Sequence, residues 1–267
     1  MNKAIAVMGC GWLGLPLGKR LVDEGYLVHG STTSESKIDK LSKTGIKPFV
    51  IDLSENIIKG PISQFLTNVG VLIINIPPKL RGEHVENYVS KMELVLEVLY
   101  KSAVTKVIFV SSTSVYGEVS GEVTEDTVPQ PITESGRQLL ASENLFKSST
   151  RFKTTIIRFG GLIGPNRHPI NTLAGRKGLK NGNYPVNLVH LDDCIEIMVS
   201  TIKKGWWGEL FNAVYPLYSS KIDYYLKESS KRGLISPEFE RNVTKFGKEI
   251  ISNRLIHVKK YVFKTTI

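Results

Sequence analysis

The sequence predicts an α/β fold: a doubly wound parallel sheet of the Rossmann type with a smaller C-terminal lobe for substrate. Two observations lead to this fold class. Short apolar segments alternate with amphipathic helical patterns over residues 4–161, which is the element order of a parallel sheet with crossover helices. The strand segments are apolar along their whole length, as expected when helices cover both faces of a sheet.

Six segments have the length and apolar content of buried strands, and helical patterns separate them. The expected strands span residues 4–9, 26–32, 47–53, 69–78, 106–112 and 153–161. The expected helices span residues 13–25, 35–45, 84–103 and 137–148. The third helix has the clearest pattern, because apolar residues recur along it at helical spacing. These residues are Val85, Tyr88, Val89, Met92, Val95, Leu96 and Leu99.

The pattern changes after residue 160, where a stretch rich in Gly and Pro begins. A strand and helix then follow over residues 186–205, another strand over 209–216 and another helix over 219–233. We expect residues 1–160 to form the nucleotide-binding domain, with its last elements returning from 187–215. Residues 161–267 form the small lobe, which would lie over the carboxyl edge of the sheet, where α/β proteins bind ligands.

The composition predicts a soluble globular protein. No apolar run approaches the ~20 residues that a membrane span needs, and the first apolar run breaks into glycines, as a strand and not a signal peptide would. Cys10 and Cys194 are the two cysteines, too few for a disulfide framework, so we expect a cytoplasmic location. The net charge of +10 is mostly dispersed along the chain, which disfavours nucleic acid as the partner and favours small anionic ligands.

A glycine-rich segment follows the first strand and opens the first helix. Residues 9–14 read G-C-G-W-L-G. In this context the first glycine makes a tight turn, the second lets a pyrophosphate approach the backbone, and the third lets the helix pack on the strand. The helix N-terminus favours the phosphates of the ligand. We therefore expect a dinucleotide here, bound by Gly9, Gly11, Trp12, Leu13 and Gly14.

The end of the second strand bears on which dinucleotide binds. An acidic residue there would bond the ribose 2′-hydroxyl of NAD, and a basic one would accept the 2′-phosphate of NADP. The segment has no acid at its start and no arginine, and it carries hydroxyl groups and one lysine: Ser31, Thr32, Thr33, Ser34 and Lys37. The sequence favours NADP, with NAD as the alternative.

Four segments in order resemble the extended short-chain dehydrogenases/reductases, a group that includes the NAD(P)-dependent epimerases and dehydratases of nucleotide sugars. They are the glycine-rich turn, VSSTSVYG at residues 110–117, RFGGLIGP at 158–165 and NLVHLDDCIEIM at 187–198. GKEIISNRL at 247–255 resembles the closing segment of these proteins. The match is nearest to the atypical, YeeZ-like epimerase branch.

The resemblance implies where catalytic groups would lie. Ser112 takes the place of the residue that polarises the substrate carbonyl or hydroxyl. Family members usually carry a Tyr general acid/base and, four residues later, a Lys that lowers its pKa; an unperturbed Tyr, with a pKa near ~10, is a poor base at neutral pH. The matching segment has Ser135 and Leu139 at these positions, while Pro131 and Glu143 keep the register. Ser112 and Ser135 are therefore the candidate catalytic residues.

The resemblance implies further binding positions. Ile76, Pro77, Ser111 and Arg158 would contact the cofactor. Tyr116 would form a wall of the pocket, and residues 166–168 would meet the substrate in the small lobe, unless they form an ordinary solvated loop. That group consists of Asn166, Arg167 and His168.

No metal site is expected, because His190, Asp192 and Asp193 lack a third ligand at metal spacing. Asp192 is expected to cap the helix that starts at Cys194 or to form a bond across the two lobes.

Two functions remain open at this point, with nucleic-acid binding as a third that rests on charge alone. The first is an NAD(P)-dependent epimerase or oxidoreductase acting on a nucleotide-activated or phosphorylated sugar. The second is a dinucleotide-binding sensor or scaffold without turnover. The resemblance also implies a homodimer built on the helices at 84–103 and 137–148.

Overall fold

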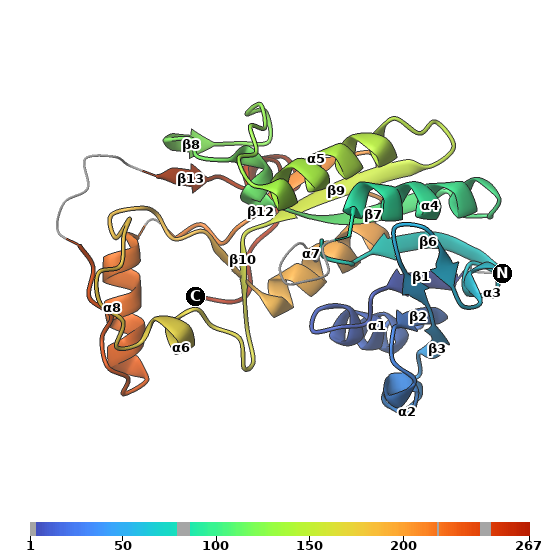
Figure 1. The fold of residues 1–267 in the computed structure, drawn as a ribbon, viewed down its shortest axis with the longest axis horizontal. Coiled ribbons are helices and arrows are strands. Elements are labelled where there is room, and N and C mark those ends of the chain that lie inside the picture. The colour runs from blue at the N-terminus through green and yellow to red at the C-terminus, as the bar shows by residue number, and fades with distance from the viewer. Residues whose placement is uncertain (1–3, 79–85, 218, 241–246) are drawn as a thin grey trace.

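A seven-stranded parallel sheet forms the centre of the computed structural model, which describes residues 4–78, 86–217, 219–240 and 247–267 (Figure 1). The strand order is β12-β9-β7-β6-β1-β2-β3. The strands are β1 (Ala4–Met8), β2 (Val28–Thr32), β3 (Lys47–Val50), β6 (Val69–Ile74), β7 (Lys106–Ser112), β9 (Lys153–Phe159) and β12 (Leu210–Ala213). The predicted doubly wound fold is confirmed.

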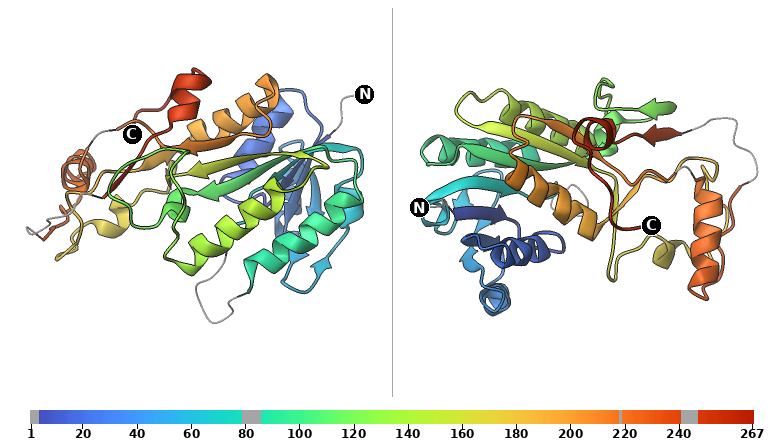
Figure 2. Two further views of the ribbon diagram at one scale, coloured as in Figure 1. Left: turned by 90° about the horizontal axis from the view of Figure 1, so that it is seen from above. Right: turned by 180° about the vertical axis from the view of Figure 1, so that it is seen from behind.

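Side chains alternate between two cores on either side of this sheet. On β1, Ala4, Ala6 and Met8 face one core, and Ile5 and Val7 face the other. The first core is covered by α4 (Tyr88–Tyr100) and α5 (Glu134–Lys147), and the second by α1 (Gly14–Asp23) and α7 (Leu191–Lys204). Figure 2 shows the helices on both faces. Burial on both faces explains why the strands are apolar throughout.

The order of the strands reverses beside β1, because β2 and β6 lie on its two sides. The connections that follow β1 and β6 therefore run in opposite directions and open a crevice at the carboxyl ends of these strands. Residues that follow β2 and β3 lie on one side of the crevice. Residues that follow β6 and β7 lie on the other side.

Several expected elements differ from the observed ones at their ends. The strand expected at 47–53 is interrupted at Ile51, after which β4 (Asp52–Leu53) pairs antiparallel with β5 (Ile58–Lys59). The helix expected at 35–45 divides into the 3₁₀ turn η1 (Glu35–Lys37) and the short α2 (Ile38–Ser42).

The helix expected at 137–148 begins earlier, at Glu134, because the Thr133 hydroxyl caps it by accepting the Gly136 N–H at 3.1 Å. Two further short helical elements, α3 (Ile62–Phe65) and the 3₁₀ turn η2 (Thr113–Tyr116), lie between strands. Residues 84 and 85 of the third expected helix lie outside the described residues.

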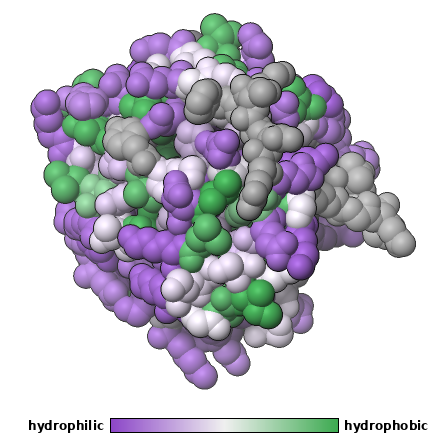
Figure 3. Space-filling model, turned by 90° about the vertical axis from the view of Figure 1, so that its left-hand side faces the viewer, coloured by the Kyte–Doolittle hydropathy of each residue, from purple (hydrophilic) through white to green (hydrophobic). Residues whose placement is uncertain are grey.

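The small lobe has its own core beyond the carboxyl edge of the sheet. Its elements are β10 (Gly161–Ile163), α6 (Ile170–Leu173), β11 (Leu188–His190) and α8 (Lys221–Lys231). β8 (Gly121–Val123) and β13 (Lys248–Ile250) form a separate parallel pair. The buried core residues are Ile163, Ile170, Val186, Leu188, Tyr224 and Tyr225. Figure 3 views this end of the molecule, where hydrophobic side chains are scattered over a mostly hydrophilic surface. The domain boundary at residue 160 stays a prediction, although β12 and α7 pack with the main sheet.

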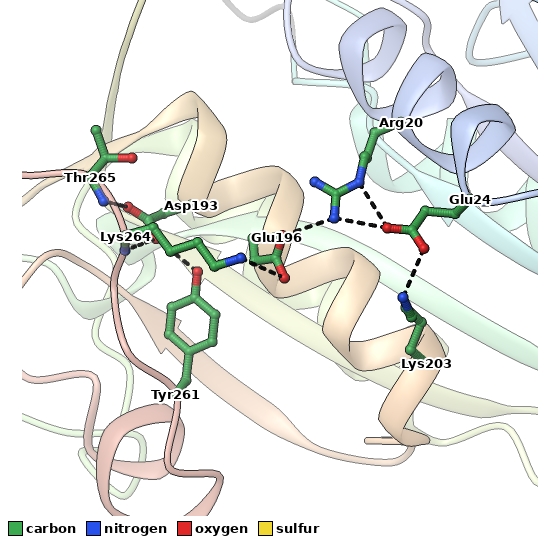
Figure 4. A network of polar contacts seen from close by, with 8 residues as sticks. All are labelled: Arg20, Glu24, Asp193, Glu196, Lys203, Tyr261, Lys264 and Thr265. Atoms are coloured by element: carbon green, nitrogen blue, oxygen red, sulfur yellow. Dashed lines mark hydrogen bonds and ion pairs between the residues drawn. The ribbon is translucent and has the colours of Figure 1, made fainter.

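The start of α7 corrects the expectation for Asp192. His190, and not Asp192, caps the helix: its Nδ1 accepts the Asp192 N–H at 3.2 Å. Asp193 is fully buried and binds the C-terminal tail, which follows the π-helical turn η3 (Arg254–Val258). Its carboxylate accepts the Tyr261 hydroxyl at 2.8 Å and the backbone N–H groups of Lys264 and Thr265 at 2.8 and 3.0 Å (Figure 4).

A ladder of charges along α7 ties this helix to α1 and to the same tail. Arg20 of α1 lies 2.9 Å from Glu24 and 3.2 Å from Glu196. Lys203 lies 2.7 Å from Glu24, and Lys264 lies 3.2 Å from Glu196 (Figure 4). These pairs are partly exposed and individually weak, so the buried contacts of the tail fix its position.

Within the described ranges, no helix combines the length and the apolar composition that crossing a bilayer requires.

Candidate functional site

A cleft of about 540 Å³ lies at the switch point of the sheet. Most of the residues that the sequence assigns to a binding site line this cleft. They are Gly9, Gly11, Trp12, Leu13, Ser31, Thr32, Thr33, Ile76, Pro77, Ser111, Ser112 and Arg167. Six assigned residues do not line it: Gly14, Tyr116, Ser135, Arg158, Asn166 and His168.

The glycines of the turn divide into two that the fold requires and one that faces open space. Gly9 has φ +101°, and a Cβ there would lie 2.6 Å from the Asn75 carbonyl oxygen. A Cβ on Gly14 would lie 2.1 Å from the Gly9 carbonyl oxygen. A Cβ on Gly11 meets nothing within 4 Å. The fold does not need glycine at position 11, and the missing side chain leaves room for a ligand to approach the backbone closely.

Hydrogen bonds from β2 and β6 hold the glycine-rich turn in place. Ser31 Oγ accepts the Gly9 N–H at 2.9 Å, and the Ser31 carbonyl accepts the Cys10 N–H at 2.8 Å. From the other side, Asn75 Nδ2 donates to the Gly9 carbonyl at 3.0 Å. Cys10 points inward, and its burial raises the pKa of the thiol to about 12, so it is an unreactive core residue.

The cleft has a polar end beyond β2 and β3. Thr33, Lys37 and Asp52 line this end, and all three are exposed. Thr32 Oγ1 accepts the Ser34 N–H at 3.3 Å and shapes the bend that follows β2. One cation, one carboxylate and a hydroxyl therefore surround the place where the glycine-rich fold holds an adenosine ribose.

Trp12 and Arg167 connect the glycine-rich turn to the small lobe. The Arg167 guanidinium lies over the Trp12 ring at 4.8 Å, and Trp12 Nε1 donates to the Pro165 carbonyl at 3.3 Å. Asn166 has φ +58°, and the Arg167 N–H donates to the Gly164 carbonyl at 3.0 Å, which closes a tight turn. Asn166 thus shapes the turn that presents Arg167 to the cleft.

The structure places His168 in the core of the small lobe. Its side chain is buried, with Nε2 3.0 Å from the Tyr224 hydroxyl and Nδ1 accepting the Ile170 N–H at 3.1 Å. Burial lowers the pKa of His168, and the positive charges of Arg232 and Lys231 lower it further, against the opposing effect of the Glu228 carboxylate, which lies 3.7 Å from Nε2. These contacts make His168 a packing residue of the small lobe, away from the cleft.

The opposite end of the cleft lies beyond β6 and β7. Ser112 lines it, and its Oγ accepts the Ser114 N–H at 3.1 Å, so this hydroxyl has a fixed position and a proton still to donate. Leu139, from α5, lines the same end. Ser135 lies in the first turn of α5, half-buried and away from the cleft lining.

Arg158 and Tyr116 belong to a buried network behind this end of the cleft. Arg158 Nε donates to the two carboxylate oxygens of Glu143 at 3.0 and 3.2 Å, and Nη2 donates at 2.5 Å. Ser111 Oγ donates to the same carboxylate at 2.5 Å. The Arg158 guanidinium lies 4.8 Å from the Tyr116 ring centre, and the Tyr116 hydroxyl donates to Asn212 Oδ1 at 2.8 Å. Through Ser111, this network positions the rim of the cleft.

Sequence reasoning missed four polar residues that line the cleft: Asp52, Asn75, Glu86 and Lys91. Lys91 left a visible signal, because a lysine interrupts the apolar stripe between Tyr88 and Val95. Asn75 left one as well, since it directly follows a buried strand on the cleft side.

The fold and the cleft define a class: doubly wound α/β proteins with a ligand crevice above a glycine-rich turn. Residues 5–213 match the NAD dependent epimerase/dehydratase family. The chain belongs to this family, as the resemblance in its motifs predicted.

Relatives and solved structures agree with this assignment. Protein YeeZ of Escherichia coli K12 is 31% identical over 242 residues, which cover 90% of this chain and 88% of YeeZ. YtcB of Bacillus subtilis, described as an uncharacterized UDP-glucose epimerase, is 25% identical over 57% of this chain and 55% of its own length. The UDP-glucuronic acid 4-epimerase of Bacillus cereus, solved with NAD, superposes with a TM-score of 0.82 at 20% identity, covering 98% of this chain and 92% of the epimerase.

Proposed function

We propose that this protein binds NADP or NAD in the cleft and acts, as an epimerase or oxidoreductase, on a nucleotide-activated or phosphorylated sugar. The observation that carries the proposal is Gly11, which the fold leaves open to a cleft of about 540 Å³. A cleft of this size is within the range that small-molecule and cofactor sites occupy.

We propose NADP as the preferred cofactor. Lys37 and the Thr33 hydroxyl line the end of the cleft beyond β2, and a lysine can pair with a 2′-phosphate as a point charge. Asp52 lies at the same end, one strand further from the turn, and would favour the free 2′-hydroxyl of NAD if it reached the ribose. Lys37→Ala separates the two: it should weaken NADP binding alone if the lysine holds the phosphate.

The substrate would meet the protein where the small lobe faces the cleft. Arg167 offers a guanidinium that can bind a diphosphate through two parallel hydrogen bonds. Ser112 would donate a hydrogen bond to the substrate oxygen on the carbon that is oxidised or reduced, and a bound nicotinamide would supply the hydride exchange. Ser112→Ala should then lower turnover without changing cofactor affinity. The nucleotide-sugar enzymes among the relatives support this substrate class.

A non-catalytic sensor or scaffold is the second candidate function. Leu139 favours it, because an apolar side chain lines the cleft at the position where the resemblance places a lysine. Cofactor binding with no turnover over a broad panel of nucleotide sugars would support the sensor.

The first experiment is a titration of the protein with NADPH, NADP, NADH and NAD by calorimetry. Micromolar binding of one pair supports the proposed function and identifies the cofactor. Gly11→Ala is the matched variant, since its methyl group has room in the free protein but would occupy the space of the pyrophosphate. Binding of none of the four would refute the proposal.

The predicted homodimer and cytoplasmic location belong to this proposal too. A dimer would pair α4 and α5 with their symmetry copies, and analytical ultracentrifugation tests it directly.

A further inference from the structure

A lysine is buried in the wall of the cleft. Lys91 lies on α4, with only 11% of its side chain exposed. Among the charged residues that line the cleft in the described chain, Lys91 is buried, whereas Lys37, Asp52 and Arg167 are exposed. Lysines are almost never buried without a partner, so its surroundings need an explanation.

The partner of Lys91 is Glu86, and both side chains line the same cleft. On α4 itself, the neighbours of Lys91 are core residues: Tyr88, Met92 and Val95 are all fully buried. Tyr88 fixes the helix, since its backbone N–H donates to Gln138 Oε1 of α5 at 2.6 Å and its hydroxyl donates to the Ile76 carbonyl at 2.8 Å. An apolar residue would fill this place without a desolvation cost, so packing alone does not account for a lysine.

The strand order assigns Lys91 to one half of a dinucleotide. The adenosine side of the cleft lies beyond β2 and β3, with Thr33, Lys37 and Asp52. Lys91 lies on the other side, beyond β6 and β7, where Ser112 and Leu139 also line the cleft. A dinucleotide bound across the switch point places its second nucleoside there.

We propose that the ammonium group of Lys91 binds the hydroxyl groups of the second ribose of the cofactor, with Glu86 holding the ammonium in place. This inference rests on the proposed function. It gives the cleft a cation on the side that Leu139 also lines, and this cation comes from α4 instead of α5. Lys91 is then a cofactor-binding residue, and Glu86 is its positioning residue.

The test compares a whole dinucleotide with half of one. ADP contains the adenosine and the diphosphate but lacks the second nucleoside, so its affinity should not depend on Lys91. Calorimetric titrations with NADP, NAD and ADP are run on the wild type, Lys91→Met and Lys147→Met. Lys147 is the matched control, because it is an exposed lysine on α5. A lost hydrogen bond to a charged group should lower dinucleotide affinity by roughly 10- to 100-fold in Lys91→Met, with ADP affinity and the control unchanged.

Two further variants separate binding from folding. Leu139→Lys, added to Lys91→Met, should restore part of the lost affinity by supplying the cation from α5. Glu86→Gln keeps the lysine and should produce a smaller loss in the same direction. An equal loss for ADP and the dinucleotide in Lys91→Met, or no loss for either, would overturn the role of Lys91. A wild type that binds no dinucleotide more tightly than ADP would instead overturn the proposed function, on which this inference depends.

Discussion

The buried pair of Arg158 and Glu143 allows one prediction to be worked through from the structure. Arg158→Met removes all three hydrogen bonds that the guanidinium gives to the carboxylate, while the Ser111 hydroxyl still donates one. The Glu143 side chain is 2% exposed, so water cannot replace the lost donors. Removing one partner of a buried ion pair costs about 3–5 kcal/mol, and we expect Arg158→Met to lower the free energy of unfolding by that amount.

The double variant Glu143→Leu/Arg158→Met should lose much less. Replacing both charges by apolar groups removes the uncompensated charge and is often close to neutral. Ser111 loses its acceptor, at a cost of about 1 kcal/mol. Urea unfolding followed by circular dichroism at pH 7 measures all the variants. If the double variant is as unstable as Arg158→Met, or if Arg158→Met loses under about 1 kcal/mol, the assignment of the pair as a buried, mutually dependent unit is wrong.

Three further predictions concern the turn and the small lobe. Gly14→Ala should destabilise the fold by about 1–3 kcal/mol, because its Cβ would overlap the backbone. Gly11→Ala should keep the stability of the fold and lower the cofactor affinity by at least roughly tenfold. Thermal melts and calorimetry compare the two variants, and equal melting points would contradict the distinction. Arg167→Ala should change the Trp12 emission by removing a contact of about 0.5–1 kcal/mol, and the change should vanish in a Trp12→Phe background. His168 has a folded-state pKa below the unfolded value of ~6.5, so its stabilising effect is present above that pH and is lost as pH falls through the lowered pKa. His168→Gln should therefore reduce the change in the free energy of unfolding between pH 7 and pH 4.5. An unchanged pH dependence of this free energy would argue against a neutral buried imidazole.

The fold and the glycine-rich turn could be predicted from the sequence, because the signals for both are local. Continuous apolar segments indicate strands that are buried on both faces. The spacing of the glycines in residues 9–14 is typical of one kind of strand–turn–helix connection. The family assignment from the motifs was confirmed. Each of these signals lies within a short window of the chain.

The polar residues that line and support the cleft were harder to predict, because they come from elements that are distant in the sequence and meet only in the folded chain. Arg158 and Ser111 occupy adjacent strands in register, but only the packing of α5 brings Glu143 between them and makes the arginine internal. His168 carries no local mark that distinguishes a substrate ligand from a core residue. Lys91 could be noticed as a charged residue within an apolar stripe, but this pattern does not show whether the charge faces solvent or a cleft.

The binding of the C-terminal tail to Asp193 has a consequence for the order of events during synthesis. Asp193 and Thr265 are separated by 72 positions in the chain, which at ribosomal speed correspond to roughly 4–14 s. Throughout that interval the nascent chain contains α7 with a carboxylate whose three donors do not yet exist. Docking of α7 on the sheet must therefore wait until residues 261–265 have been made or proceed with water in their place, and a ribosome-bound chain that lacks these residues should remain sensitive to protease at α7.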